Sequence, residues 1–402
     1  PQDAKQIGGL ALFLASSIAV MISKILLSVL ALGASGAAAI SVKSKAEEHQ
    51  LRGAPTTGLI HPERQAQLEE IKHLATTWTA RAGRWAREAP GASAPVLGHL
   101  GDNKLNVAAA KERGEVVDFV PKLVNPIPDS FDSAKEWPKC AKLINDIRDQ
   151  SNCGCCWAFA GAEAASDRMC IATDGDKSLP ISAQDVCFNS NLNGCNGGQI
   201  TTPWTYIRWR GAVSGGQYNN TGPFGNMGLC SNWGFGHCHH HGPQRDDPYP
   251  DEGAEGCKSD KSPPGPTKCD HSAKGSHADF KADKYKFHGT TETASGEEAI
   301  QRMIMEGGPV ETAFTVYSDF EDYAGGIYQR TTGKPAGGHA VKIVGWGVEN
   351  GTKYWKIANS WNPYWGEKGF FRIVRGKNEC GIEDQVTGSP SGAKWTKASE
   401  EL

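Results

Sequence analysis

The sequence predicts an α+β fold, with helices and a β-hairpin on separate parts of the chain. Three observations carry this prediction. Apolar residues recur at a helical spacing within residues 63–77. An alanine-rich segment with good helix composition follows Cys156. Far downstream, the turn dipeptide Asn350-Gly351 lies between two apolar runs, a pattern typical of a β-hairpin.

The charge balance and the cysteines limit the class of protein. The 402 residues carry 42 basic and 45 acidic side chains, a formal net charge of −3. A nucleic-acid-binding protein would show a basic excess, so that class is disfavoured. All 12 cysteines lie between Cys140 and Cys380, so the first third of the chain differs in kind from the rest. So many cysteines indicate metal or redox chemistry in a cytosolic enzyme and disulfides in a secreted protein.

The N-terminal segment resembles an export signal. Met21 is followed by Lys24, an apolar run and small residues ending at Ala39. This pattern predicts a leader and secretory signal peptide over residues 1–42, with translation starting at Met21. The alternative is a signal anchor or transmembrane helix over residues 7–42. Both place the rest of the chain in an oxidising compartment, where disulfides persist.

Residues 43–126 contain no cysteine and form either a small accessory domain or a removable prosegment. Leu68, Ile71 and Leu74 predict a helix near the start of this segment. The Asn-Pro-Ile-Pro sequence of residues 125–128 predicts a rigid, extended link at its end. Because the cysteines begin directly after this link, we favour the prosegment.

Three residues far apart in the sequence have the chemistry of a nucleophilic site. Cys156 lies where a loop enters the predicted helix, so its thiolate gains from the helix dipole and from free backbone N–H groups. His339 precedes a predicted strand at 341–346, and the returning strand at 354–358 leads to Asn359. A Cys-His-Asn set suits nucleophilic catalysis, because the imidazole takes the thiol proton and the amide orients the imidazole.

The residues around Cys156 resemble a known family. Residues 153–157 read Cys-Gly-Cys-Cys-Trp, close to the signature around the papain nucleophile except at the third position. Residues 238–241 read Cys-His-His-His within a Gly-, Pro- and Cys-rich stretch, 222–275, and resemble the occluding loop of cathepsin B. Further matching segments are Trp137-Pro138-Lys139-Cys140, Asp167-Arg168-Met169-Cys170, Tyr317-Ser318-Asp319-Phe320 and Gly345-Trp346-Gly347-Val348-Glu349-Asn350-Gly351-Thr352. From about Ile127 to about Gly388, the chain resembles a papain-like cysteine protease of cathepsin B type.

This resemblance implies an organisation for the whole chain. It implies a papain-like two-lobed fold, with a helical left lobe, a β-barrel-like right lobe, an occluding-loop insertion and the active site in the cleft between the lobes. Residues 1–42 are then the leader and signal peptide, 43–126 the propeptide and 127–402 the peptidase domain, released by cleavage near Ile127. The implied activity is cysteine-type endopeptidase and peptidyl-dipeptidase, made as an inactive zymogen that enters the secretory pathway toward a lysosome-like compartment or the extracellular space.

The resemblance also assigns catalytic roles. Cys156 matches the nucleophile, His339 the acid/base, Asn359 the orienting amide and Gln150 the oxyanion-hole donor. We expect the pKa of the Cys156 thiol to fall below its free value of about 8.5 once an imidazolium partner forms.

Other residues match substrate-binding positions. Gly197 and Gly198 match the edge that holds substrate backbone, and Trp361 the ring that shields the His–Asn contact. Gln385 falls where cathepsin B commonly has an acidic residue at the floor of the S2 pocket, which takes the P2 residue, the second on the N-terminal side of the scissile bond. A neutral amide at Gln385 should weaken any preference for Arg at P2, which Arg-Arg and Phe-Arg reporters would test.

The histidine run predicts the exopeptidase activity. His240 and His241 match the pair that receives the C-terminal carboxylate of a substrate, and Asp149 the carboxylate that holds this loop through the first of the pair. The pair could instead be His239 and His240, although the spacing from Cys238 favours the later two. Three histidines after a cysteine also raise a zinc hypothesis, but the sequence has no second ligand cluster at finger spacing. We therefore expect no metal and no cofactor.

The family framework implies four disulfides and leaves three cysteines unassigned. The implied pairs are Cys140–Cys170, Cys153–Cys195, Cys187–Cys269 and Cys238–Cys257. Cys156 stays free to act, and Cys155, Cys230 and Cys380 remain. Cys230 lacks its usual partner because Ala273 stands at that position. Cys155 replaces a small residue beside the nucleophile, either as a tolerated thiol or as a site of oxidative sensitivity.

Two rival functions remain, and labelling by an active-site-directed epoxide or vinyl sulfone would separate them from the protease. The C-x-x-C spacing of Cys153 and Cys156 could mark a redox site, although the flanking βαβ pattern is missing. A non-catalytic homologue is the second rival, although all four catalytic positions are filled. The protease hypothesis implies peptide and protein substrates, the chain's own propeptide as an inhibitor, cystatin-type inhibitors, no nucleic acid and a monomeric mature enzyme.

Overall fold

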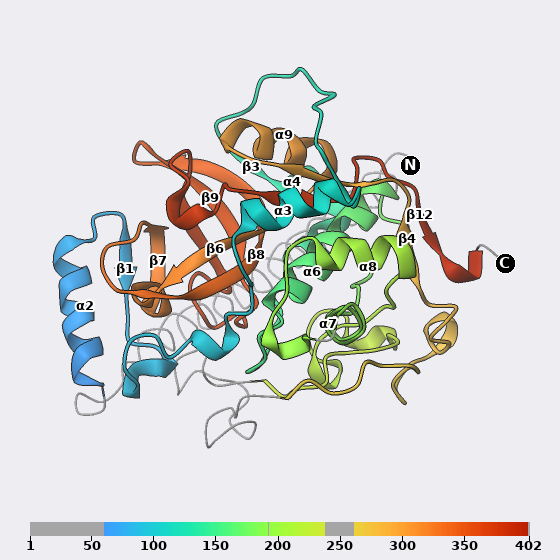
Figure 1. The fold of residues 1–402 in the computed structure, drawn as a ribbon, viewed down its shortest axis with the longest axis horizontal. Coiled ribbons are helices and arrows are strands. Elements are labelled where there is room, and N and C mark those ends of the chain that lie inside the picture. Colours follow the sequence, from blue (N-terminus) through green and yellow to red (C-terminus); the bar gives the residue numbers. More distant parts are fainter. Residues whose placement is uncertain (1–59, 192, 238–260, 401–402) are drawn as a thin grey trace, which may run out of the picture. The chain divides into compact units, whose positions relative to one another are not determined.

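A computed structural model of the chain describes residues 60–191, 193–237 and 261–400 (Figure 1). Backbone contacts divide the chain into Pro1–Ala54 and Pro55–Leu402, and the described residues all belong to the second unit. The predicted signal peptide, His240, His241 and the predicted Cys238–Cys257 bond lie outside the described residues. Within the described ranges, no helix is both long and apolar enough to cross a membrane.

The helices begin close to the positions that the sequence predicts. The first follows the cap residue His61, whose ring Nδ1 accepts a hydrogen bond from the Glu63 amide at 3.3 Å. The described α-helices are α2 (Pro62–Leu74), α3 (Asn103–Glu112), α4 (Ser133–Glu136), α5 (Ala141–Ile144), α6 (Cys156–Ala172), α7 (Ala183–Asn189), α8 (Thr202–Arg210) and α9 (Glu297–Gly307).

The strands lie mostly in the last third of the chain. They are β1 (Trp78–Ala80), β2 (Val116–Asp118), β3 (Phe131–Asp132), β4 (Tyr285–Phe287), β5 (Thr291–Ala294), β6 (Val310–Tyr317), β7 (Tyr323–Tyr328), β8 (Pro335–Glu349), β9 (Thr352–Ala358), β10 (Phe370–Val374), β11 (Val386–Gly388) and β12 (Trp395–Lys397). The predicted hairpin is β8–β9, and Asn350 and Gly351 at its turn both have positive φ, 49° and 77°. The α+β class is confirmed.

The main sheet is open at both ends. Its order is β1-β7-β10-β9-β8-β6-β11-β5-β2, with β3 paired to β8, and β4 and β12 form a separate pair. Within the described residues the sheet is therefore not a closed barrel, so the barrel-like part of the expectation is corrected. The two end strands, β1 and β2, both come from the predicted prosegment, which covers edges that would otherwise offer unpaired backbone groups.

Helix α6 connects the helices to the sheet. Every residue from Cys156 to Cys170 is buried. On one side α6 contacts α7 and α8, which form the helical lobe with it, and on the other it contacts β8 in the sheet lobe (Figure 1). The helices approach closely because Gly161 has no side chain: a Cβ there would lie 2.4 Å from the Pro203 ring. A functional group at the start of α6 is thus held rigidly between the two lobes.

Two predicted disulfides are present and one is corrected. The structure contains the Cys140–Cys170 and Cys153–Cys195 bonds. The Cys187–Cys269 prediction is wrong. The two cysteines are instead bonded to residues that the sequence left unassigned, in the pairs Cys155–Cys187 and Cys230–Cys269.

Chain geometry explains the exchange of partners. A backbone hydrogen bond from the Asp270 amide to the Cys230 carbonyl (2.7 Å) brings the two segments together, and the Cys230 and Cys269 Cα atoms lie 4.5 Å apart. With Ala273 in the position of the missing cysteine, Cys269 is the partner within reach. Cys187 then pairs with Cys155, whose Cα lies 6.1 Å away. Cys156 and Cys380 are the free cysteines of the described residues.

Candidate active site

Cys156 lies at the first residue of α6, as the sequence predicts. Its thiol is fully buried, and its Sγ accepts hydrogen bonds from the backbone N–H groups of Gly98 (3.3 Å) and Ala340 (3.4 Å). Ala340 directly follows His339 on β8, so this contact joins the start of the helix to the strand that carries the histidine. The nucleophile and the histidine thus come from opposite lobes.

His339, Asn359 and Trp361 form one buried group. The Nε2 atom of His339 lies 2.8 Å from the Oδ1 of Asn359, across the β8–β9 hairpin. The indole of Trp361 lies against the imidazole, with ring centroids 4.8 Å apart and an interplanar angle of 31°. All three side chains are 1% exposed or less, so water is kept from the His–Asn hydrogen bond.

Gln150 is held beside Cys156 by contacts at both ends of its amide. Its Oε1 accepts a hydrogen bond from the Ser360 hydroxyl (2.7 Å), which fixes the amide so that Nε2 points the other way. That Nε2 donates to the carbonyl oxygens of Cys153 and Val96, both at 2.8 Å. A donor aimed at a carbonyl beside the nucleophile is the arrangement that an oxyanion hole requires.

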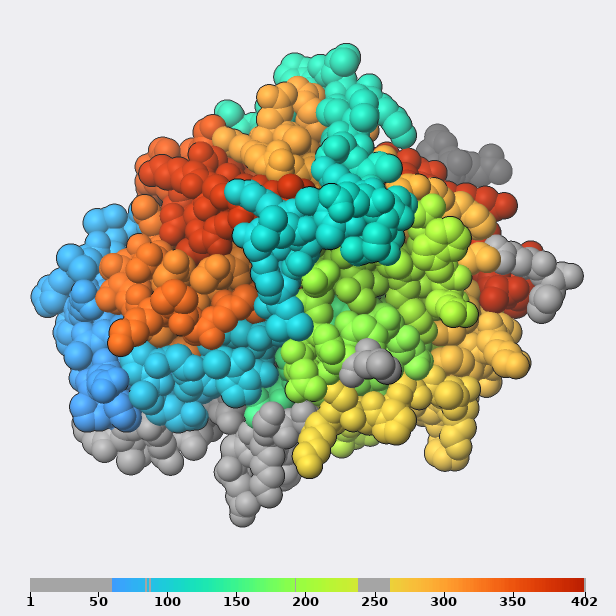
Figure 2. Space-filling view, viewed as in Figure 1, coloured from blue at the N-terminus to red at the C-terminus, as the bar shows by residue number. Residues whose placement is uncertain are grey.

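The predicted prosegment runs through this site. Gly98 and its neighbours bond to both lobes: the Gly198 amide donates to the Gly98 carbonyl, the Leu100 amide to the Gly198 carbonyl and the His99 amide to the Gly338 carbonyl, each at 2.9 Å. Figure 2 shows the blue and cyan prosegment surface lying against both the orange sheet lobe and the green helical lobe.

Glycines make this close approach feasible. A Cβ at Gly98 would lie 1.8 Å from the Gly154 carbonyl oxygen, and one at Gly198 would lie 2.5 Å from the Trp157 ring. Gly197 has φ 111°, and its Cβ would meet the Gly98 carbonyl oxygen at 2.7 Å. Gly197 and Gly198 therefore lie at the edge where the sequence places substrate backbone, which the prosegment occupies here.

Burial keeps the Cys156 thiol neutral in this structure. Burial raises the pKa of the Cys156 thiol to about 11, and the backbone N–H groups of Ala340 and Gly98 oppose this only in part. The thiol is thus neutral in the covered form, contrary to the expected low pKa. The lower value stays a prediction for the uncovered enzyme, where the imidazolium partner can form.

Two further prosegment contacts were not evident from the sequence. Arg64 of α2 is fully buried and donates to Asp322 (2.8 Å) and Glu321 (2.9 Å) in the sheet lobe. Trp85 packs edge-on against Trp361, with centroids 5.6 Å apart. No local sequence motif marks these residues, because their partners lie more than 200 positions away.

The structure describes some of the predicted substrate-binding residues, and others lie outside the described residues. The Oε1 of Gln385 accepts a hydrogen bond from the Thr293 hydroxyl at 2.8 Å. A cavity that Gly338 lines is also lined by the preceding residue, Asp384, and not by Gln385. Asp149 lies beside His237, with Oδ2 3.7 Å from Nδ1, whereas the predicted contact with His240 falls outside the described residues.

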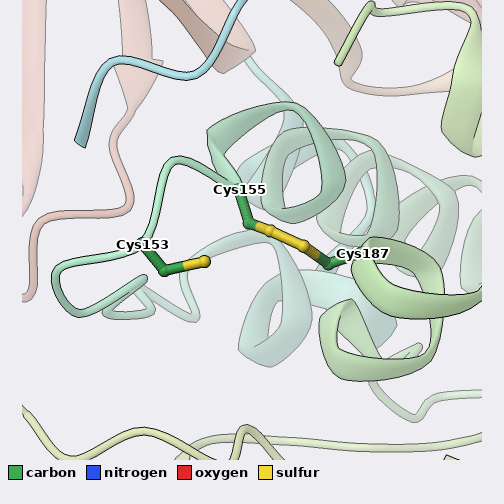
Figure 3. A group of neighbouring side chains, drawn as sticks. All are labelled: Cys153, Cys155 and Cys187. Atoms are coloured by element: carbon green, nitrogen blue, oxygen red, sulfur yellow. A yellow bond between two sulfur atoms is a disulfide. The ribbon is translucent and has the colours of Figure 1, made fainter. Parts of the chain in front are cut away.

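Three cysteine sulfur atoms lie close together, but they do not form a metal site. The sulfur atoms of Cys153, Cys155 and Cys187 all lie within 4.8 Å of one another (Figure 3). Each is bonded in a disulfide, so none offers a thiolate to a metal. Because Cys153 is bonded to Cys195, the bridge between Cys153 and Cys156 that the redox hypothesis requires is not formed.

Comparison with known proteins identifies the family. The profile of the papain family cysteine proteases matches residues 127–389. This chain belongs to the papain family of cysteine proteases. It is a cysteine peptidase of cathepsin B-like type, since it is 44% identical over 290 residues to a cathepsin B-like cysteine proteinase of Schistosoma japonicum, covering 71% of this chain and 80% of that protein. It is also 45% identical over 267 residues to cathepsin B-like cysteine proteinase 4 of Caenorhabditis elegans, covering 65% and 75%.

Solved proenzyme structures show the same fold. ProCathepsin B S9 from Trypanosoma congolense matches 82% of this papain-family chain and 98% of its own, with a TM-score of 0.63 and 29% identity. The Amb a 11 cysteine protease of ragweed pollen in its proform matches 86% and 92%, with a TM-score of 0.55 and 22% identity, which bears on the fold alone.

Proposed function

We propose that this cathepsin B-like peptidase hydrolyses peptide bonds through Cys156, His339, Asn359 and Gln150. One observation carries the proposal: the Cys156 thiol and the Gln150 amide meet on one short stretch of prosegment backbone, beside the His339–Asn359 hydrogen bond. This is the location in which a substrate peptide would be attacked.

In the proposed mechanism each group has one task. Asn359 holds His339 through its Nε2, and the other ring nitrogen takes the proton of Cys156. The thiolate attacks the substrate carbonyl carbon, and the Gln150 Nε2 stabilises the oxyanion that forms. His339 then gives its proton to the leaving amine, and water activated by the same imidazole releases the acyl group from Cys156.

The prosegment is proposed to act as the inhibitor. Cys156 Sγ faces the Gly98 N–H, and the Val96 carbonyl already takes the Gln150 donor. The chain therefore fills the site without presenting a carbonyl carbon to a thiolate. Release would follow cleavage near Ile127, where Val124 is 92% exposed and Val120 is 72% exposed.

The finer activity and the route through the cell are also proposals. His240 and His241 would bind the C-terminal carboxylate of a substrate and favour removal of dipeptides. The disulfides of the described residues support an oxidising compartment on the secretory route, lysosome-like or extracellular. We also expect cystatin-type inhibitors to bind the enzyme and the mature enzyme to be monomeric.

Active-site labelling tests the proposal. An epoxide or vinyl sulfone inhibitor should label Cys156 in the processed enzyme and fail to label the Cys156→Ser variant. His241→Ala should lower dipeptide release while sparing internal cleavage. Labelling at another residue, or peptide hydrolysis by Cys156→Ser, would contradict the mechanism, and equal loss of both activities in His241→Ala would contradict the exopeptidase role.

A further inference from the structure

The linker between the predicted prosegment and the peptidase domain lies beside helix α9 (Figure 1). Residues 120–126 are all exposed, and Val124 is 92% exposed. Exposed chain segments are where proteolytic cleavage concentrates. In the proposed activation the enzyme is released when this linker is cut, so the contacts that hold the linker affect the release.

Glu306 of α9 binds two consecutive backbone N–H groups of the linker. Its Oε1 accepts hydrogen bonds from the amides of Lys122 (2.7 Å) and Leu123 (2.9 Å). In an extended strand successive residues face opposite sides, so two adjacent N–H groups cannot converge on one oxygen. The carboxylate therefore holds the backbone in a turn-like form, in which adjacent amides bind an anion together.

Arg302, one helical turn before Glu306, binds the carbonyl groups of the same stretch. Its Nη1 donates to the carbonyl oxygens of Leu123 (3.2 Å) and Asn125 (3.4 Å). Its Nε and Nη2 lie 2.9 Å from the carboxylate of Glu298, which orients the guanidinium. We call Arg302 and Glu306 the linker clamp, because these neighbours on one face of α9 hold both the N–H and the carbonyl groups of residues 122–125.

The linker is fixed more deeply on either side of the clamp. On one side the Phe119 amide donates to the Thr293 carbonyl at 2.8 Å, and on the other the Trp346 indole donates to the Pro128 carbonyl at 2.9 Å. Thr293 and Trp346 are 1% and 2% exposed, whereas both residues of the linker clamp are partly exposed. The clamp is therefore the attachment that can open while the sheet lobe stays folded.

A peptidase acts on a peptide that it binds in extended form over several residues. Even a cut near Ile127 would need residues 122–125 to leave α9 and straighten. We propose that Arg302 and Glu306 control proteolytic processing of this chain by keeping residues 122–125 out of the extended form that a peptidase cuts. Processing itself adds water across one peptide bond and leaves a carboxylate on the prosegment and an amine on the peptidase domain. The proposal rests on the proposed role of the prosegment.

Trypsin is a direct probe of the clamp, because it cuts after Lys122, within the clamped stretch. In the full-length Cys156→Ser chain, Glu306→Ala should raise the rate of cleavage after Lys122 by roughly 10-fold or more. The variant removes the charged acceptor of two hydrogen bonds, and cleavage follows the population of the opened linker. Arg302→Ala should raise the rate by a smaller factor, because its hydrogen bonds to the linker are longer.

An internal reference and two further variants keep the test specific. Each rate is divided by that of cleavage after Lys72, whose side chain is 74% exposed on α2. Glu306→Gln keeps an acceptor for both amides and should have a smaller effect than Glu306→Ala. Asp174→Asn, which removes a carboxylate that is 87% exposed, should leave the ratio unchanged.

An unchanged ratio in Glu306→Ala would overturn the proposal, and so would an equal rise at both sites, which would mean that the whole prosegment had loosened. The chain in this assay needs no activity of its own. If the processed wild-type enzyme cleaved no peptide, the proposed function would fail, whereas the trypsin result on the clamp would stand.

Discussion

At the residue scale, Gly98 and His99 of the predicted prosegment fit against the site through their size and charge. At position 98 only glycine fits beside the Gly154 carbonyl, because a Cβ there would lie 1.8 Å from that oxygen. His99, the next residue, is buried, and burial lowers the pKa of its ring to about 4, so the ring is uncharged near neutral pH. The first property fixes the path of the backbone, and the second makes its binding depend on pH.

We expect acidification to loosen the prosegment through His99. The pKa of His99 is lowered to about 4 in the covered form, whereas a free histidine titrates near 6.5. The released state therefore takes up a proton first as pH falls below about 6.5, so covering is fully favoured above that pH and weakens progressively toward pH 4. The loss amounts to about 3 kcal/mol.

Hydrogen exchange checks this expectation. In the Cys156→Ser chain, which lacks the proposed nucleophile, amides of residues 97–100 should lose protection, after correction for intrinsic exchange, between pH 6.5 and 4. His99→Phe should flatten this dependence, and His73→Gln, an exposed histidine on α2, should not change it. A His99→Phe chain with the wild-type pH profile would rule out His99 as the sensor.

At the element scale, a buried cation is one of the groups that join α2 to the sheet lobe. Arg64 donates to Glu321 and Asp322, and also to the carbonyl oxygens of Glu88 and Ala89 at 3.0 and 3.1 Å. It thus ties the helix to the sheet lobe and to the next prosegment turn. Removing one partner of a buried ion pair leaves the other charge unpaired, which is strongly unfavourable.

Arg64→Met should therefore weaken the docking of α2 by about 3–5 kcal/mol. The measurement is hydrogen exchange of the α2 amides in the Cys156→Ser chain, with Lys72→Met as the control. Lys72 lies on the same helix with its side chain 74% exposed, and its removal should have no effect. Equal protection of α2 in the wild-type and Arg64→Met chains would show that the ion pair does not hold the helix.

The sequence predicted the catalytic elements better than it predicted their covering. Cys156 at a helix start and the Asn350-Gly351 hairpin were predicted because a few adjacent residues determine each of them. His339 was expected just before a strand but lies within β8, which begins earlier, at Pro335. The β1 and β2 pairings and the Arg64 contacts could not be predicted in this way, because each joins segments far apart in the sequence.

The cysteine pairing also could not be predicted fully from the sequence. Ala273 stands where a partner cysteine is expected, and Cys155 is an additional cysteine. Both Cys187 and Cys230 therefore have partners other than the expected ones. Spacing along the sequence does not reveal this, because pairing depends on which Cα atoms approach within about 7 Å.

At the scale of the whole molecule, the two lobes meet across a buried group of charges. The Lys342 ammonium of β8 lies 2.7 Å from Asp167 and 3.8 Å from Glu163, both on α6. Arg148 and Asp146 form a second buried pair nearby, 3.3 Å apart, and both pairs influence Glu163. Asp167 makes the close ion pair with Lys342, whereas Glu163 is too far from the ammonium for a direct hydrogen bond.

Glu163 should therefore make the folded enzyme less stable as pH rises. Burial raises the pKa of Glu163 to about 7, against 4.5 for an ordinary glutamate, and Lys342 opposes this only in part. The folded state keeps a proton that the unfolded state loses above pH 4.5, so the free energy of unfolding falls as pH rises from about 4.5 through 7. Glu163→Gln mimics the protonated form, so it should be more stable than the wild type at pH 8 by about 3 kcal/mol and nearly equal to it at pH 4.5. Urea denaturation of the Cys156→Ser chain at both pH values measures this, with Glu298→Gln, whose side chain is 70% exposed, as the control. If the Glu163→Gln chain lost stability with rising pH as steeply as the wild type, other groups would be responsible for this pH dependence.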